Sequence, residues 1–165
     1  MSNELEKTVQ RLADIEAIKQ LKAEYCAACD DGYDPDRLAA LFTEEAVWNG
    51  GRTFGVAEGR EAIRAHFRGA SQRVTIARHQ VMNPIVEVDG DRATGQWLLF
   101  QPCTAAGSDG AEQAVWLAAT YTDAYVRSPD GPLGWLIAGT DIDVAFFTAF
   151  DQGWAEQRFL PGRQP

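Results

Sequence analysis

Apolar residues recur at steps of three and four over the first part of the chain. The members of this series are Val9, Leu12, Ile15, Ile18, Leu21 and Tyr25. This spacing places the apolar side chains on one face, so it predicts an amphipathic helix over residues 4–29. Asp30, Asp31 and Gly32 interrupt the pattern, and Gly32 suits the left-handed backbone that ends many helices.

Two shorter helices are predicted to follow. Asp34 is a suitable N-cap, and Pro35 is preferred in the first turn of a helix. A strand is expected over residues 43–48, with residues 53–54 pairing back after a glycine-rich turn. Residues 61–68 predict the third helix, because their apolar positions lie four residues apart.

Extended patterns fill the second half of the chain. Alternating apolar and polar residues predict strands over residues 74–88, 93–104, 114–127 and 135–147. The intervening turns are predicted at residues 89–90, 106–110 and 128–132. Helices followed by a meander of long strands indicate an α+β fold. We expect one domain over residues 1–165, in which a strongly curved antiparallel or mixed sheet wraps three N-terminal helices as a cone-shaped barrel with an apolar interior.

Composition narrows the class of partner. The 165 residues are 45% hydrophobic and carry a formal net charge of -9. Phosphate binding requires a basic patch, so we expect no nucleic-acid partner and no anionic membrane surface. The N-terminus lacks the apolar segment of a secretory signal, and no apolar run is long enough to span a bilayer. These features predict a cytoplasmic protein and leave a small apolar organic molecule open as its partner.

The cysteines do not predict a disulfide framework or a metal site. Cys26 and Cys29 have the spacing of a redox motif, but they fall inside the predicted first helix, so two buried small residues are the better interpretation. Together with Cys103 and two histidines, the chain offers too few ligands for a zinc site. We therefore expect no metal and no cofactor.

The candidate chemistry lies at the end of the first predicted helix. Asp30 follows three small residues that indicate a protein-facing wall, and a carboxylate there needs a partner. His79 is the most suitable one. A carboxylate that accepts from Nδ1–H of an imidazole leaves Nε2 free as a base and stabilises the cation that forms. Tyr25 carries a phenol that can donate to a substrate carbonyl or to a departing hydroxyl.

Several segments resemble the SnoaL-like branch of the nuclear-transport-factor-2-like superfamily. They are IKQLKAEYCAACDDG, DRLAALFTEEAVW, GREAIRAHF, RHQVMNPIVEVDGDRATG, YTDAYVR and GWLI. The resemblance places Asp30 and His79 where scytalone dehydratases and hexachlorocyclohexane dehydrochlorinases carry an Asp–His dyad. Tyr25, five residues before Asp30, matches the Tyr–Asp–His pattern of bile-acid 7α-dehydratases. Two departures argue against a scytalone substrate: no histidine follows His79, and Cys29 directly precedes Asp30.

The resemblance implies a cofactor-independent lyase, a dehydratase of an apolar cyclic or polycyclic carbonyl compound. His79 would be its base, Asp30 the orienting partner and Tyr25 the acid. An isomerase or polyketide-cyclase-like enzyme is the alternative from the same dyad, and a non-catalytic module like the beta subunits of ring-hydroxylating dioxygenases is the alternative from another class. His66 is expected to be at the surface or partly buried and not to be catalytic.

Aromatic side chains are candidates for the wall of a substrate pocket. They are Trp48, Trp97, Trp116, Tyr121 and Phe146. Apolar residues on both faces of the third long strand further predict that a second copy covers the outer face of the sheet, in a homo-oligomer that is a trimer or a dimer.

Overall fold

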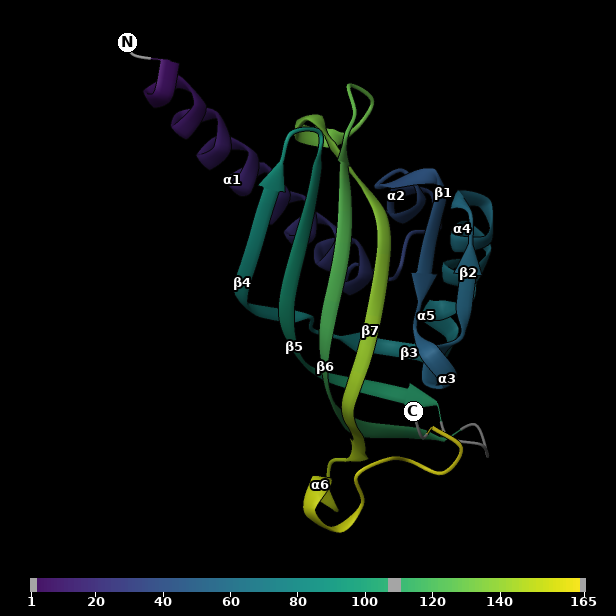
Figure 1. Ribbon diagram of the computed structural model, residues 1–165. Coiled ribbons are helices and arrows are strands. Elements are labelled where there is room, and N and C mark those ends of the chain that lie inside the picture. The colour runs from purple at the N-terminus through teal and green to yellow at the C-terminus, as the bar shows by residue number, and fades with distance from the viewer. Residues whose placement is uncertain (1–2, 107–110, 164–165) are drawn as a thin grey trace.

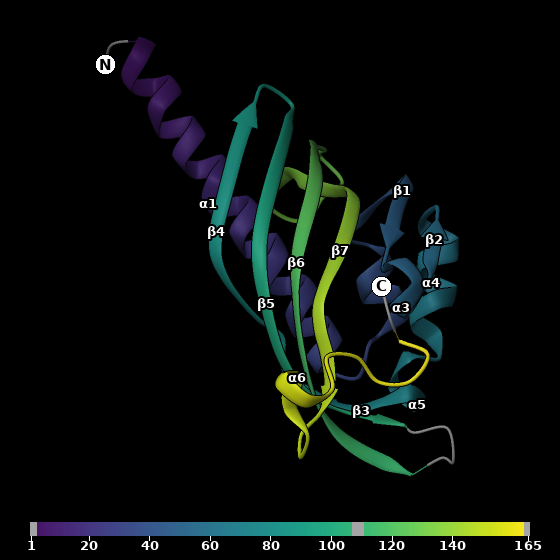
Figure 2. The same cartoon turned by 60° about the horizontal axis from the view of Figure 1, so that its bottom comes forward.

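A long helix lies across a curled sheet in the computed structural model, which describes residues 3–106 and 111–163 (Figures 1 and 2). The helix α1 spans Asn3–Asp30. Its buried face begins near Ile18, whereas Leu5, Val9 and Leu12 are about half exposed because the first turns extend beyond the sheet. The periodic pattern therefore predicted the helix correctly, but only its second half packs against the core.

Short helical segments lie at several places around the sheet (Figure 1). They are α2 (Pro35–Ala39), α3 (Gly51–Phe54), α4 (Arg60–Arg68), α5 (Ala70–Arg73), a 3-10 turn (Pro132–Gly134) and α6 (Gly153–Glu156). Asp34 caps α2 as expected, since its carboxylate accepts from the backbone N–H groups of Asp36 and Arg37. Residues 53–54 do not pair back as a strand: they end α3, and the strand that pairs with β1 starts at Val56.

Seven strands form one mixed sheet. They are β1 (Phe42–Asn49), β2 (Val56–Glu58), β3 (Val74–Ala77), β4 (Gln80–Asp89), β5 (Arg92–Ala106), β6 (Glu112–Arg127) and β7 (Trp135–Ala149). Their order is β2-β1-β7-β6-β5-β3, and β4 also pairs with β5. Only the β1–β7 pairing is parallel. The prediction of an α+β fold is confirmed, with a sheet that curls but does not close. Of the predicted turn at 106–110, Ala106 ends β5 and the rest lies outside the described residues.

The two faces of the sheet differ in what they pack against. Along β5 and β6 the odd-numbered residues from Ala93 to Cys103 and from Val115 to Tyr125 face the interior. This alternation is the period of two expected of a sheet with one buried face. The helix α1 covers that inner face. The C-terminal end of β5 and the N-terminal end of β6, together with β3, bend across below α1 (Figures 1 and 2). The bend leaves a space between the end of α1, the helices α4 and α5, and the strands.

A buried ion pair ties α1 to the sheet. The ammonium of Lys22 lies 2.9 Å from the carboxylate of Asp123 on β6, and both side chains are almost fully buried. Tyr125 donates to the same carboxylate at 2.7 Å, and Lys22 also lies 3.5 Å from the ring centre of Tyr121. Because buried charges are costly unless paired, these contacts fix the rotation of α1 and so the direction in which Tyr25, one turn later, points.

Candidate functional site

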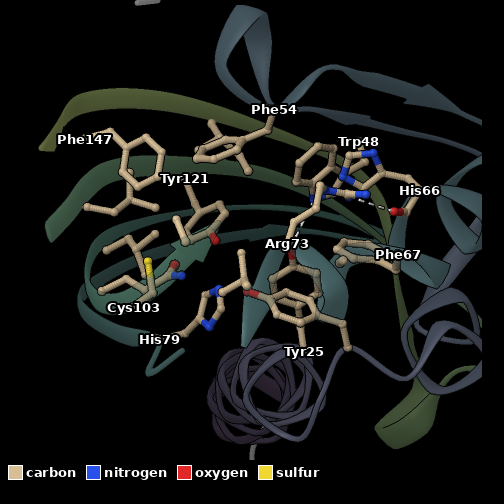
Figure 3. Close-up of a pocket in the computed structure, with 18 of the residues that line it drawn as sticks. Tyr25, Trp48, Phe54, His66, Phe67, Arg73, His79, Cys103, Tyr121 and Phe147 are labelled. Atoms are coloured by element: carbon tan, nitrogen blue, oxygen red, sulfur yellow. Dashed lines mark hydrogen bonds between the residues drawn. The ribbon is translucent and has the colours of Figure 1, made fainter. Parts of the chain in front are cut away.

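The space beneath the bend is a cavity of about 130 Å³ with a largely aromatic wall (Figure 3). Tyr25 and Tyr33 come from the end of α1 and the turn after it, and Trp48 comes from β1. Strands β5, β6 and β7 contribute Leu99, Gln101, Cys103, Leu117, Tyr121, Ile142 and Phe147. Tyr25 also makes edge-to-face contacts with Phe67 and Tyr121, which hold the ring in one orientation.

Asp30 contacts His79, and His79 lines this cavity. Asp30 is the last residue of α1, and the chain turns away through Gly32 and Tyr33, both with positive φ. His79 lies in the short link between β3 and β4. Oδ1 of Asp30 is 2.6 Å from Nδ1 of His79, and the carboxylate also accepts from the backbone N–H of His79 at 3.0–3.1 Å. The geometry expected from the sequence is therefore present.

These contacts determine which nitrogen of His79 carries the proton. A carboxylate is an acceptor, so the short contact is satisfied by Nδ1–H. In the neutral ring Nε2 is then unprotonated, and the His79 side chain, 5% exposed, lines the cavity. Asp30 is 24% exposed and reaches solvent on its outer side. His79 thus lines the cavity while its Nδ1 contacts the carboxylate of Asp30.

Tyr25 faces the same cavity with its hydroxyl partly engaged. Its oxygen accepts from Nε1 of Trp48 at 3.0 Å. Complete burial raises the pKa of the Tyr25 phenol well above its usual value. The group therefore stays protonated, which suits a hydrogen-bond donor and excludes a phenolate base near neutral pH.

A profile of the SnoaL-like domain matches residues 10–141, which is most of the chain. The chain belongs to the SnoaL-like family. An uncharacterized protein of Mycobacterium tuberculosis H37Rv, Rv2910c, is 30% identical over 125 residues, covering 75% of this chain and 82% of that protein.

Several solved structures share the fold of this SnoaL-like protein. A protein from Novosphingobium aromaticivorans assigned as a scytalone dehydratase superposes with a TM-score of 0.76 at 20% identity, covering 87% of this chain and 91% of that one. The hexachlorocyclohexane dehydrochlorinase LinA type 2 gives 0.74 at 23%, covering 87% and 93%. An NTF2-like protein with a cystatin-like fold from Novosphingobium aromaticivorans gives 0.65 at 24%, covering 93% and 92%. At these identities the likeness shows the fold.

Two of the five aromatic residues predicted for the pocket line the cavity, and three do not. Trp48 and Tyr121 line it. Trp116 points outward, where it stacks on Phe100 and makes a tilted ring contact with Phe150, because even-numbered positions of β6 face away from α1.

The other two exceptions lie on β7 and β5. Phe146 also faces outward and stacks on Trp154, whereas its neighbour Phe147 enters the cavity. Trp97 is on the inner face but farther along β5, where its indole donates to the hydroxyl of Tyr125 at 3.2 Å. It packs against Gly95, at which an added Cβ would lie 2.9 Å from both the indole of Trp97 and the Tyr125 ring.

The cavity includes polar residues that were not predicted to line it. His66, expected to be at the surface or partly buried, is partly buried in the wall, with its ring 4.4 Å from that of Trp48. Burial, and next the charge of Arg73, lower the pKa of His66. Arg73 ends α5 and Arg163 belongs to the C-terminal tail, and both line the cavity. Only the position of His66 beside Phe67 in the third helix could have signalled an inward residue.

The described residues offer little for metal or thiol chemistry. Within residues 3–106 and 111–163 no three His, Cys, Asp or Glu side chains are placed to hold a metal ion. Cys103 lines the cavity, but burial raises the pKa of its thiol to about 11, so it is protonated near neutral pH. None of the helices in the same described ranges has the length and apolar character to cross a lipid bilayer.

Proposed function

We propose that this SnoaL-like protein is a cofactor-independent lyase, a dehydratase that acts on an apolar cyclic or polycyclic carbonyl compound. The observation that carries the proposal is the 2.6 Å contact between Asp30 and Nδ1 of His79, because it leaves Nε2 as a free base in a cavity lined by aromatic rings. Membership of the SnoaL-like family and the fold shared with a protein assigned as a dehydratase support the same class of reaction.

The residues suggest a sequence of proton transfers. Nε2 of His79 removes the proton from the carbon next to the substrate carbonyl, and the electron pair moves onto the carbonyl oxygen. The Tyr25 hydroxyl donates a hydrogen bond to that oxygen or to the departing hydroxyl. The electron pair then returns from the carbonyl oxygen, the double bond forms, and the hydroxyl leaves as water with the proton that His79 took up. Asp30 stabilises the imidazolium while it exists.

The experiment is turnover on a panel of cyclic β-hydroxy ketones, followed by the ultraviolet absorbance of the conjugated enone. His79→Ala should lower turnover by about 10²–10⁴-fold, the usual contribution of a general base. Tyr25→Phe should cost about 10²–10³-fold, as for one lost oxyanion donor. Asp31→Asn is the matched control, because Asp31 adjoins Asp30 but its side chain is 83% exposed.

Three results bear on the reaction class. Wild-type turnover in folded His79→Ala would exclude the dyad mechanism. An isomerised product without loss of water, formed with the same dependence on His79, would favour the isomerase or cyclase alternative. Binding of the panel without any turnover would favour a ligand-binding module.

A further inference from the structure

The charge of the cavity is opposite to that of the protein. The chain has 24 acidic and 15 basic residues, yet among the described residues no aspartate or glutamate lines the cavity. The ionisable side chains with basic groups that line it are His66, Arg73, His79 and Arg163. A net charge of -9 would place carboxylates there by chance more readily than guanidinium groups. Of these four residues, Arg73 and Arg163 carry a fixed positive charge, and these two guanidinium groups favour a ligand of opposite charge.

Both guanidinium groups are held at the cavity but lack a carboxylate partner among the described residues. Arg73 donates to the backbone carbonyl of His66 at 3.3 Å. Arg163 donates to the carbonyl of Thr53 at 2.8 Å, and the Thr53 hydroxyl donates back to the carbonyl of Arg163 at 3.2 Å. Neither forms a salt bridge with a described residue, unlike Arg37, Arg64 and Arg127. Backbone carbonyls orient these side chains without neutralising them.

A neutral ligand in this cavity would displace water from the two guanidinium groups without replacing its hydrogen bonds. A carboxylate replaces the hydrogen bonds of that water with charge-assisted hydrogen bonds, and the planar guanidinium group matches the planar shape of a carboxylate. In Figure 3, Arg73 lies with His66 and Trp48 on one side of the cavity, and His79 lies on the other. A ligand held by its carboxylate at Arg73 would extend its apolar body over the aromatic wall toward His79.

We propose that the cavity binds an apolar organic anion, whose carboxylate is held by Arg73 and Arg163. The proposal rests on the same site as the proposed dehydratase and narrows its substrate to a cyclic carbonyl compound that also carries a carboxylate. His66, partly buried beside Arg73, forms the adjoining wall.

A matched pair of probes tests the charge preference. Calorimetric titration with 2-naphthoate and with 2-naphthamide compares an anion with a neutral molecule of the same shape. We expect 2-naphthoate to bind at least about ten-fold more tightly, as one charge-assisted contact contributes. The ratio should fall toward one in Arg73→Gln and decrease in Arg163→Gln, and it should be retained in Arg73→Lys.

Two controls separate this proposal from others. Arg68→Gln makes the same change in net charge at an exposed residue that does not line the cavity, so its ratio should stay at the wild-type value. His79→Ala should also keep the ratio, which separates anion binding from the dyad chemistry. Equal affinities for the two probes, no measurable binding of either, or an unchanged ratio in both Arg73→Gln and Arg163→Gln would overturn the proposal.

Discussion

Asp30→Asn tests the arrangement of the candidate dyad most directly. Oδ1 of Asp30 lies 2.6 Å from Nδ1 of His79 and 3.0 Å from its backbone nitrogen, and Oδ2 lies 3.1 Å from the same backbone nitrogen. Asparagine has the same shape, but an NH₂ donor replaces one acceptor oxygen. The side-chain amide can therefore occupy this position in two ways, and they place the proton of His79 on different nitrogens.

The NH₂ group meets a second donor in both orientations, because Oδ1 and Oδ2 lie 3.0 and 3.1 Å from the backbone nitrogen of His79. If the amide oxygen takes the place of Oδ1, it accepts from Nδ1–H as in the wild type. If the NH₂ group takes that place, it donates to Nδ1, and the ring proton moves to Nε2. The donor conflict, which costs about 1–3 kcal/mol when buried, therefore does not select between the two orientations. The carboxylate allows only the first arrangement, so we expect the ring protonated at Nε2 to become populated in Asp30→Asn.

Nitrogen NMR of histidine-labelled protein reads this change without a substrate. The chain has two histidines, so a His66→Gln variant assigns the signals of His79. At alkaline pH the wild type should show a ring protonated at Nδ1, and Asp30→Asn should show a population protonated at Nε2. The variant should also lose up to about 10⁴-fold in kcat, because an amide does not stabilise the imidazolium and a ring protonated at Nε2 cannot accept a proton there. Asp31→Asn should match the wild type. Protonation of wild-type His79 at Nε2, or identical spectra for Asp30→Asn and the wild type, would refute the reasoning.

Two further predictions concern pH and assembly. Burial lowers the pKa of His66 in the folded state, so the unfolded chain binds a proton first as pH falls through about 6.5. Between pH 7.5 and 5.5 the wild type should therefore lose more free energy of unfolding than His66→Gln, as measured by urea unfolding. Equal losses in the two proteins would contradict this. Trp116 contacts Phe100 and Phe150 on the outer face of the sheet, where we expect a second copy to bind. Trp116→Glu should then give a monomer by light scattering with an unchanged circular dichroism spectrum, and a wild type that is already monomeric at micromolar concentration would exclude this interface.

A local signal places one member of the dyad. Asp30 comes where the helical period stops, and Gly32 supplies the positive φ that turns the chain away. His79 falls inside the single strand predicted over residues 74–88, which the structure divides into β3 and β4 with His79 between them. The resemblance to the SnoaL-like branch then indicated that these two residues meet. The 2.6 Å contact required no knowledge of strand register, since neither residue lies inside a strand.

Predicting which aromatic residues of the sheet line the cavity, by contrast, requires the strand register. Phe146 and Phe147 are adjacent, so one faces outward and the other lines the cavity. The bulge near Ala145, where the β6–β7 pairing shifts between Ala118 and Ala119, changes which of them points inward. A pattern of alternation cannot locate such a bulge, because one extra residue reverses the face of everything beyond it.

The curvature of the sheet also limits the prediction of pocket residues from sequence, and knowledge of the register would not remove this limit. Trp97 and Cys103 both face the interior of β5, and six residues separate them, about 20 Å along a strand. Cys103 lines the cavity, whereas Trp97 packs with Tyr125 near the buried Lys22–Asp123 pair. The difference arises because the sheet bends away from α1 along this length (Figure 2). Where the strands stay close to the helix, inward residues fill the core, and where they diverge, inward residues border open space. Arg163 reaches the cavity because the C-terminal tail pairs with β7 through Phe159 and Phe147 and because Arg163 donates to the carbonyl of Thr53. Those contacts join residues far apart in the chain, so no local pattern could assign Arg163 to the site.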